Sequence, residues 1–325
     1  MRTTLRTPVW AILVCAAFVA LALPAGATEK LRVGKAVPAA FSFTPLDVGM
    51  ATGIFARHGL AIEEFAFGGS AKLHQALAAD SLDIGLGSGP ELAFVAKGAP
   101  VLGVAAMAGA PLLLGLVIGK DSPVHTIADL KGRNISCSTA GSLTSWMVRE
   151  LSRQQGWGPD GINVLPLGAD QTQIAAMRTG QTDGMPIDLA TAYRLQGQGE
   201  ARLLMKFGDL VKDFHMHVIY ARRALIAADP EAVRAFLAGW FETIAFMRKN
   251  KAETVRIAAP VINASPEITA RVYDETMAMF SDDGHFDAKA LDTLRRSFVE
   301  MNLLPSEPDM SKLYTTQFLP SPAKS

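Results

Sequence analysis

The sequence has few cysteines and no surplus of either charge. Its 325 residues include two cysteines, and 31 basic residues balance 31 acidic ones. Because a chain without a basic surplus cannot neutralise a phosphate backbone, we expect no nucleic-acid binding. Hydrophobic residues make up 49% of the chain. That fraction excludes a disordered protein and is enough for one large core or two medium ones.

Long uncharged apolar runs are absent beyond the N-terminus. There, Arg2 and Arg6 precede an apolar stretch from Pro8 to Leu23 and a triplet of small residues ending at Ala27. This order is typical of a secretory signal peptide, whereas a membrane span needs about 20 apolar residues. We expect residues 1–27 to be removed and the mature protein to lie in the periplasm.

Removal of that segment leaves Cys137 as the only cysteine. An exported chain with one thiol has no internal disulfide, so its stability depends on its core. Cys137 precedes an expected helix, but no partner base is indicated by the sequence. We therefore interpret it as a small buried apolar residue.

The glycine patterns of nucleotide-binding enzymes and serine hydrolases are also missing. Gly85 and Gly87 begin a G-x-G-x-x-G pattern, but Pro90 occupies its last position. Ser88 is not in the G-x-S-x-G pattern of a nucleophile elbow, because Leu86 and Pro90 occupy its glycine positions. We expect no catalytic residue and no cofactor.

Short β-type runs alternate with helical patterns through the first two-thirds of the chain. The expected strands are 31–35, 61–67, 83–86, 101–105, 113–118, 134–138, 163–167, 202–205 and 216–220. The expected helices between them are 46–57, 71–79, 91–97, 143–155, 171–179 and 189–196. Such alternation predicts an α/β protein with parallel-rich sheets covered by helices on both faces.

After about Arg222 only helical patterns follow, at 230–250, 252–262, 266–280 and 288–301. Asp229-Pro230-Glu231 has the residues of a helix start: an N-cap, a proline in the first turn and an early acid. A chain of this length exceeds the usual size of a single core, so we expect two lobes.

Three expected strand-to-helix junctions are rich in glycine and serine: 68–70, 87–89 and 138–142. Junctions of this kind expose the free N–H groups of a helix N-terminus, which attract anions and the acceptor atoms of ligands. Ligands also bind beyond the carboxyl ends of strands in open α/β sheets. The alternative is that these residues only form tight turns and helix caps.

The sequence resembles the periplasmic solute-binding proteins of ABC importers of the nitrate/sulfonate/taurine type, which include binders of thiamine-pyrimidine precursors. The resemblance extends from about Leu31 to Phe280. Its segments are 43–49, 53–55, 58–60, 68–70, 83–85, 97–101, 120–123, 127–133, 180–183 and 230–237.

The resemblance implies a two-lobed, type II-like periplasmic binding protein fold, in which each lobe is a mixed sheet flanked by helices. Two hinge crossings are expected near Gly119–Pro123 and His215–Arg222. Lobe one would then contain residues 28–119 and 219–325, and lobe two residues 120–218. Ligand contact with both lobes would favour the closed form.

Ligand-binding residues carried over from the resemblance come from both lobes. Those of lobe one are Phe41, Ser42, Phe43, Thr44, Gly69, Ser70, Ser88 and Gly89. Those of lobe two are Thr139, Gly141, Ser142, Thr144 and Asp188. The phenylalanines could clasp an organic ligand, or they could simply pack in the core.

Three polar side chains leave alternatives open. Asp188 departs from the family pattern, and it either accepts from a ligand amine or caps the helix that follows. His215 and His217 lie two residues apart, but without a third ligand nearby we expect no metal. We include His217 in the site as a polar wall of the cleft.

The expected function is capture of a small organic anion or zwitterion and its delivery to a membrane permease by a monomer. Sulfonates, taurine-like zwitterions, nitrate, aromatic carboxylates and pyrimidines all suit the site. One alternative is an enzyme on the same fold related to thiamine-pyrimidine synthesis; its cysteine-rich motif is absent here. A periplasmic ligand sensor is another alternative.

Overall fold

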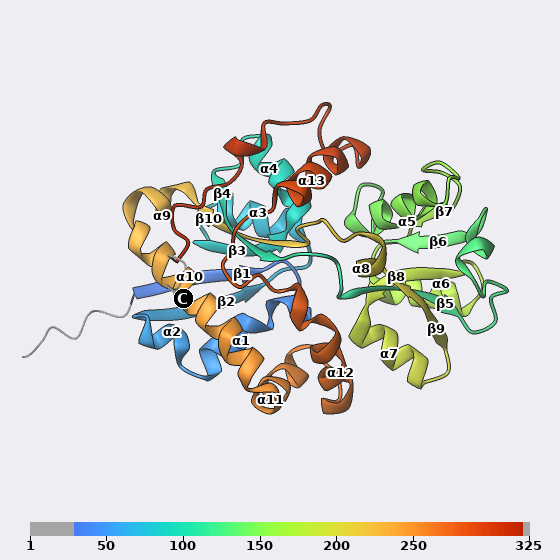
Figure 1. Ribbon diagram of the computed structural model, residues 1–325, viewed down its shortest axis with the longest axis horizontal. Coiled ribbons are helices and arrows are strands. Elements are labelled where there is room, and N and C mark those ends of the chain that lie inside the picture. The colour runs from blue at the N-terminus through green and yellow to red at the C-terminus, as the bar shows by residue number, and fades with distance from the viewer. Residues whose placement is uncertain (1–28, 321–325) are drawn as a thin grey trace, which may run out of the picture.

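The computed structural model describes residues 29–320, which form two mixed five-stranded sheets flanked by helices (Figure 1). The expected signal peptide, residues 1–27, lies outside the described residues. Within the described part of the chain, no helix combines the length and the apolarity that crossing a membrane requires.

The elements follow the expected alternation. The strands are β1 (Glu29–Lys35), β2 (Leu60–Ala66), β3 (Ile84–Ser88), β4 (Val101–Ala108), β5 (Leu114–Gly119), β6 (Asn134–Cys137), β7 (Asn163–Pro166), β8 (Gly184–Asp188), β9 (Ala201–Lys206) and β10 (His217–Arg222). The α-helices are α1 (Thr44–Ala51), α2 (Ile54–Arg57), α3 (Ser70–Ala78), α4 (Leu92–Ala96), α5 (Leu143–Gln154), α6 (Asp170–Arg178), α7 (Leu189–Gly197), α8 (Phe207–Leu210), α9 (Arg223–Ala228), α10 (Pro230–Lys249), α11 (Lys251–Val261), α12 (Pro266–Thr276) and α13 (Ala288–Glu300). Short 3-10 helices are η1 (Phe41–Phe43), η2 (Gly89–Glu91), η3 (Ile127–Leu130), η4 (Met277–Met279) and η5 (Met310–Lys312).

The two sheets share one strand arrangement. The first has the order β2-β1-β3-β10-β4 and the second the order β7-β6-β8-β5-β9. In each sheet a single strand runs antiparallel to its neighbours: β10 in the first and β5 in the second. We call the first sheet with α1–α4 and α9–α13 the first unit, and the second sheet with α5–α8 the second unit.

The strand pairing places both crossings earlier than expected. β4 ends at Ala108 in the first sheet and β5 begins at Leu114 in the second, so the outward crossing precedes β5. The sequence interpretation put it after β5, at 119–123, and thereby assigned β5 to the first lobe. The return crossing ends at Met216, because all of β10 pairs in the first sheet. β5 is apolar throughout and suits the centre of either sheet, so its pattern could not reveal its partners.

Local sequence explains where most helices begin and break. Asp229 caps α10 by accepting from the Ala232 N–H, as the Asp-Pro-Glu start predicted. The single helix expected over 46–57 is instead two helices, because Gly53 has φ 70°, a left-handed conformation that glycine adopts readily. The sequence pattern did not predict strand β8. It contains Pro186, which has no N–H to donate to a neighbouring strand and so argues against a strand.

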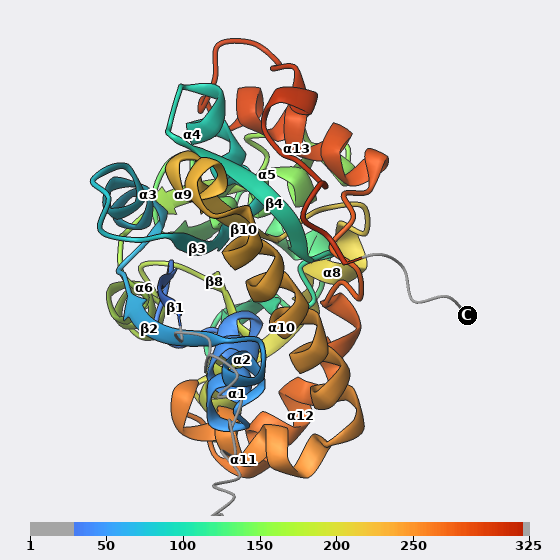
Figure 2. The same cartoon turned by 90° about the vertical axis from the view of Figure 1, so that its left-hand side faces the viewer.

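The carboxyl ends of the parallel strands lie beside the crossings in both units. His217, the first residue of β10, pairs with Ser88 at the end of β3. Leu114, the first residue of β5, pairs with Asp188 at the end of β8. Figure 1 shows α12 and α13 of the first unit beside α7 and α5 of the second, and Figure 2 shows α13 beside α5 from another side. Ser88, His217 and Asp188 therefore lie at strand ends beside the crossings.

Candidate ligand-binding site

The four candidates that follow β1 are almost fully buried. Phe41, Ser42, Phe43 and Thr44 are each at most 1% exposed. The Phe41 ring packs edge-on against Tyr273, with 6.5 Å between the ring centroids. Both phenylalanines face protein in this structure, as the core-packing alternative predicted, and their contact with a ligand stays a prediction.

His217 lies directly behind this segment. Its Nε2 is 3.4 Å from the Ser42 Oγ, and its ring contacts the edge of Phe43 with centroids 4.9 Å apart. Burial lowers the pKa of His217 to about 4, so the ring is neutral at pH 7. Its Nδ1 has no hydrogen-bond partner among the described residues. The structure thus brings His217 together with Ser42 and Phe43.

His215 and His217 contact different neighbours although they are two residues apart. The Nε2 of His215 accepts from the Asp287 N–H at 2.9 Å, and its ring packs edge-on against Phe286. No group of three histidine, cysteine or acidic side chains in residues 29–320 is arranged to hold a metal ion.

A buried carboxylate that the sequence interpretation overlooked organises the β3 junction. Glu91 accepts from the N–H and the Oγ of Ser88, at 2.7 and 3.1 Å, and from His74 Nε2 at 2.7 Å. Burial alone would raise the pKa of Glu91, but the hydrogen bonds from His74, Ser70 and Ser88 together outweigh it and lower the pKa. The S-x-x-E spacing of a capping box was the available signal for this role.

Gly69, Ser70 and Gly89 occupy neighbouring junctions of the first unit. Gly69 precedes α3 with φ 125°, and Ser70 is the first residue of that helix. Gly89 is buried, and a Cβ there would lie 1.9 Å from the carbonyl oxygen of His215. The close approach of the return crossing to the β3 junction therefore requires glycine at position 89.

The β6 junction is the helix N-terminus that the sequence predicted in the second unit. Ser142 caps α5 by accepting from the Ser145 N–H at 3.2 Å, and its hydroxyl donates to the Thr139 carbonyl at 2.8 Å. Thr144 Oγ1 lies 3.3 Å from the Ser138 nitrogen, which donates to it. The hydroxyls therefore stabilise the helix start, while the remaining first-turn N–H groups lack intrahelical acceptors.

Asp188 caps α7, accepting from the Thr191 N–H at 3.0 Å. Burial raises its pKa. Asp170, at the start of α6, also has a raised pKa, because of burial and the nearby charge of Asp188. The capping alternative for Asp188 is therefore observed, and its contact with a ligand stays a prediction.

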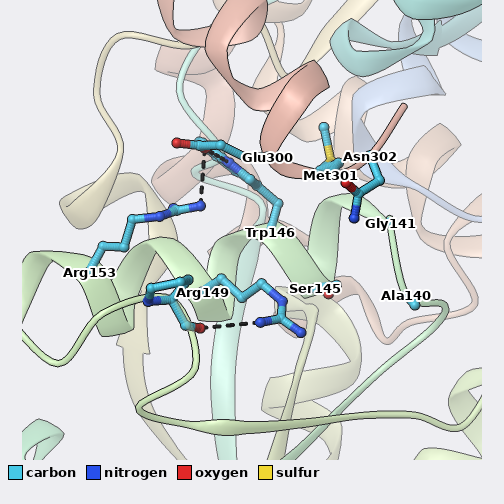
Figure 3. Close-up of a pocket in the computed structure, with 10 residues that line it drawn as sticks. Ala140, Gly141, Ser145, Trp146, Arg149, Arg153, Glu300, Met301 and Asn302 are labelled. Carbon is cyan, nitrogen blue, oxygen red and sulfur yellow. Dashed lines mark hydrogen bonds and ion pairs between the residues drawn. The ribbon is translucent and has the colours of Figure 1, made fainter. Parts of the chain in front are cut away.

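A cavity of about 500 Å³ lies between the two units beside α5 (Figure 3). It is lined by Ala140, Gly141, Ser145, Trp146, Arg149, Arg153, Pro159, Glu300, Met301 and Asn302. Gly141 is the only one of the predicted ligand-binding residues in this lining. A Cβ at Gly141 would lie 2.9 Å from the Met301 carbonyl oxygen, so the second unit touches the end of α13 there.

The two arginines of this lining were missed by sequence reasoning. Arg149 and Arg153 lie one turn apart on α5, a spacing that could have drawn attention to them. Arg149 pairs with Asp160, and Arg153 with Glu150 and Glu300. A second cavity, of about 400 Å³, lies around 119–123 and includes none of the predicted ligand-binding residues.

Solved structures with this architecture are similar over nearly the whole chain. The periplasmic aliphatic sulphonate binding protein SsuA from Escherichia coli has 20% identity and a TM-score of 0.72, covering 89% of this chain and 92% of its own. The alkanesulfonate-binding protein SsuA from Xanthomonas axonopodis pv. citri, bound to MOPS, has 20% identity and a TM-score of 0.71, covering 88% and 98%. The desulfurization enzyme DSZB has 16% identity and a TM-score of 0.64, covering 89% and 97%.

These similarities confirm the expected periplasmic binding protein fold. No curated protein sequence matches the chain significantly. A family model described as NMT1/THI5 like, however, matches residues 40–254, which is more than half of the chain. The protein therefore belongs to the NMT1/THI5-like family, as the resemblance in its sequence indicated.

Proposed function

We propose that this protein is the periplasmic substrate-binding component of an ABC importer. It captures a small organic anion or zwitterion between the two units, which act as lobes, and delivers it to a membrane permease by hinge closure. The ligand is sulfonate- or taurine-like, an aromatic carboxylate or a pyrimidine. The protein acts as a monomer without a cofactor.

One observation carries this proposal. The start of α5, which Ser142 caps, contributes Gly141 and Ser145 to the cavity between the units, and the end of α13 contributes Glu300 and Met301. A helix of 12 residues places partial positive charge at that end. Arg149 and Arg153 of the same helix also line the cavity, each paired with an acidic side chain. An anion there would contact both units, which is the requirement for ligand-driven closure.

Thermal unfolding with a ligand panel tests the binding role. The panel contains alkanesulfonates, taurine, nitrate, aromatic carboxylates and pyrimidines. A ligand at about 100 times its Kd is expected to add about 2.7 kcal/mol to the free energy of unfolding, which is several degrees in Tm. A flat response to the whole panel would contradict the proposed ligand class.

A charge placed at the α5 N-terminus tests the site itself. Ser142→Asp keeps a good N-cap but puts a negative charge where we expect an anionic ligand. Affinity for such a ligand should fall about 10- to 100-fold, measured by calorimetry. Ser142→Asn is the matched control, because asparagine also caps helices and carries no charge; its affinity should stay near wild type. Equal affinities of Ser142→Asp and wild type would remove this helix end from the site.

The similarity to DSZB supports a second candidate, an enzyme on the same fold. The buried Ser42–His217 contact supplies a hydroxyl beside a neutral imidazole, an arrangement that hydrolytic enzymes use. Incubation with an aromatic sulfinate, followed by mass spectrometry of the products, distinguishes the two candidates. An importer component returns the sulfinate unchanged, whereas an enzyme converts it.

A further inference from the structure

The two units are joined on one side of the crossings by a carboxylate of α12. The hydroxyl of Tyr193 and the Nζ of Lys206, both in the second unit, donate to Oε2 of Glu275 in the first. Arg271 donates to the Oε1 of the same carboxylate at 3.0 Å. The guanidinium of Arg271 also lies 3.6 Å from the centroid of the Tyr193 ring. One carboxylate thus collects three donors, two of them from the opposite unit.

A second carboxylate joins the units on the other side, at the end of α13. The indole Nε1 of Trp146 donates to Oε2 of Glu300 at 2.7 Å, and Arg153 pairs with the same oxygen at 3.1 Å (Figure 3). Trp146 is only 1% exposed. Because a buried N–H without an acceptor is costly, moving α13 away would penalise Trp146 until water reached it.

Both contacts are stronger than ordinary surface ion pairs. The side chains of Glu275 and Glu300 are 21% and 22% exposed, so solvent screens them only in part. Burial raises the pKa of Glu275, but the hydrogen bonds from Lys206 and Tyr193 lower it by more. The pKa therefore lies below its usual value. Glu275 is therefore ionised at neutral pH, and its bonds are charge-assisted.

The positions of the two carboxylates suit a role in the relative orientation of the units. In Figure 1, α12 lies below the segments that cross between the units and α13 lies above them, so the two contacts lie on opposite sides of the crossings. Both glutamates also lie beyond residues 40–254, the part of the chain that the family model matches.

We infer that Glu275 and Glu300 are two struts that hold the units at a fixed angle, and that Glu275, which lies outside the cavity lining, sets ligand affinity without touching the ligand. The effect of the struts on ligand affinity rests on the proposed function. Their effect on the angle between the units does not. When only a fraction of the molecules has the binding-competent arrangement, the apparent Kd rises in inverse proportion to that fraction. Loss of the struts would lower the fraction.

Charge reversal with rescue tests the struts. Glu275→Lys places a positive charge against Lys206, and adding Lys206→Glu restores a pair of opposite charges. On the other side, Glu300→Lys is the reversal and Arg153→Glu is the rescue. Lys97 of the first unit and Lys131 of the second are both exposed. Spin labels attached to Lys97→Cys and Lys131→Cys, in a Cys137→Ala background, report the distance between the units. Glu242→Lys is the matched control, since Glu242 pairs with Arg57 and His58 of its own unit.

Without ligand, we expect each reversal to broaden the distance distribution toward larger separations, and each rescue to restore it. For the Glu275→Lys variant, whose site lies outside the cavity lining, the affinity for a panel member that binds the wild-type protein should fall about fivefold or more, with recovery when Lys206→Glu is added. Distributions that match wild type in both reversed variants would overturn the inference. A shift in distance together with a flat ligand panel would support the struts and contradict the proposed function instead.

Discussion

Replacing Glu91 by alanine is expected to lower the free energy of unfolding by about 2–5 kcal/mol, because each buried donor left without an acceptor costs about 1–3 kcal/mol. Glu91 is 2% exposed and His74 is 5% exposed, and their side chains are 2.7 Å apart. The substitution leaves the imidazole and the Ser88 N–H without their acceptor. Denaturant unfolding followed by circular dichroism measures the loss.

Two further variants make this prediction specific. Glu253→Ala removes the exposed partner of Arg256 on α11 and should change the free energy of unfolding by less than about 0.5 kcal/mol. Adding His74→Ala to Glu91→Ala should cost less than the sum of the single changes, because the two residues share one interaction. A loss below about 1 kcal/mol for Glu91→Ala would show that the pair does not stabilise the fold.

Acidification from pH 6.5 to pH 4 is expected to destabilise the protein through two buried histidines. Burial lowers the pKa of both His215 and His217 from 6.5 to about 4. In that window the unfolded chain binds protons that the folded protein does not, so this stability is present above pH 6.5 and lost as the pH falls toward 4. Each histidine contributes about 3 kcal/mol to the change.

Substitution isolates this effect from other titrating groups. Asp47 has a pKa raised to about 6, chiefly by burial, and acts in the opposite direction between pH 4 and 6. The comparison is therefore between wild type and His217→Gln, or His215→Gln, over the same pH series. Each variant should have a shallower dependence of unfolding free energy on pH. Parallel curves would show that the histidine protonates equally in both states.

The residues that stabilise the two strand-to-helix junctions also shape the proposed ligand site. Glu91 orders the β3 junction through Ser88, and Ser142 orders the β6 junction through its cap. The junctions belong to different units, so a ligand that contacts both must bring the units together. Glu275, outside the cavity lining, then affects binding through the position of the units alone.

Much of the local structure follows from the sequence. The alternation of strands and helices, the all-helical C-terminal part and the cap at Asp229 arise from interactions between residues close in the chain, which local pattern reports directly. The same holds for the glycine- and serine-rich start of α5, where Ser142 caps the helix. The motif spacing also indicated the family, because it persists in order along most of the chain.

Only the tertiary structure decided which strands pair and which side chains meet between the units. β5 is equally apolar on both faces, so its place in the second sheet depends on long-range pairing that its own residues do not encode. Arg153 and Glu300 are far apart in the chain and meet because α5 and α13 pack across the crossings. Only the structure likewise showed that Phe41 and Phe43 are buried, since the exposure of a side chain depends on every element that packs around it.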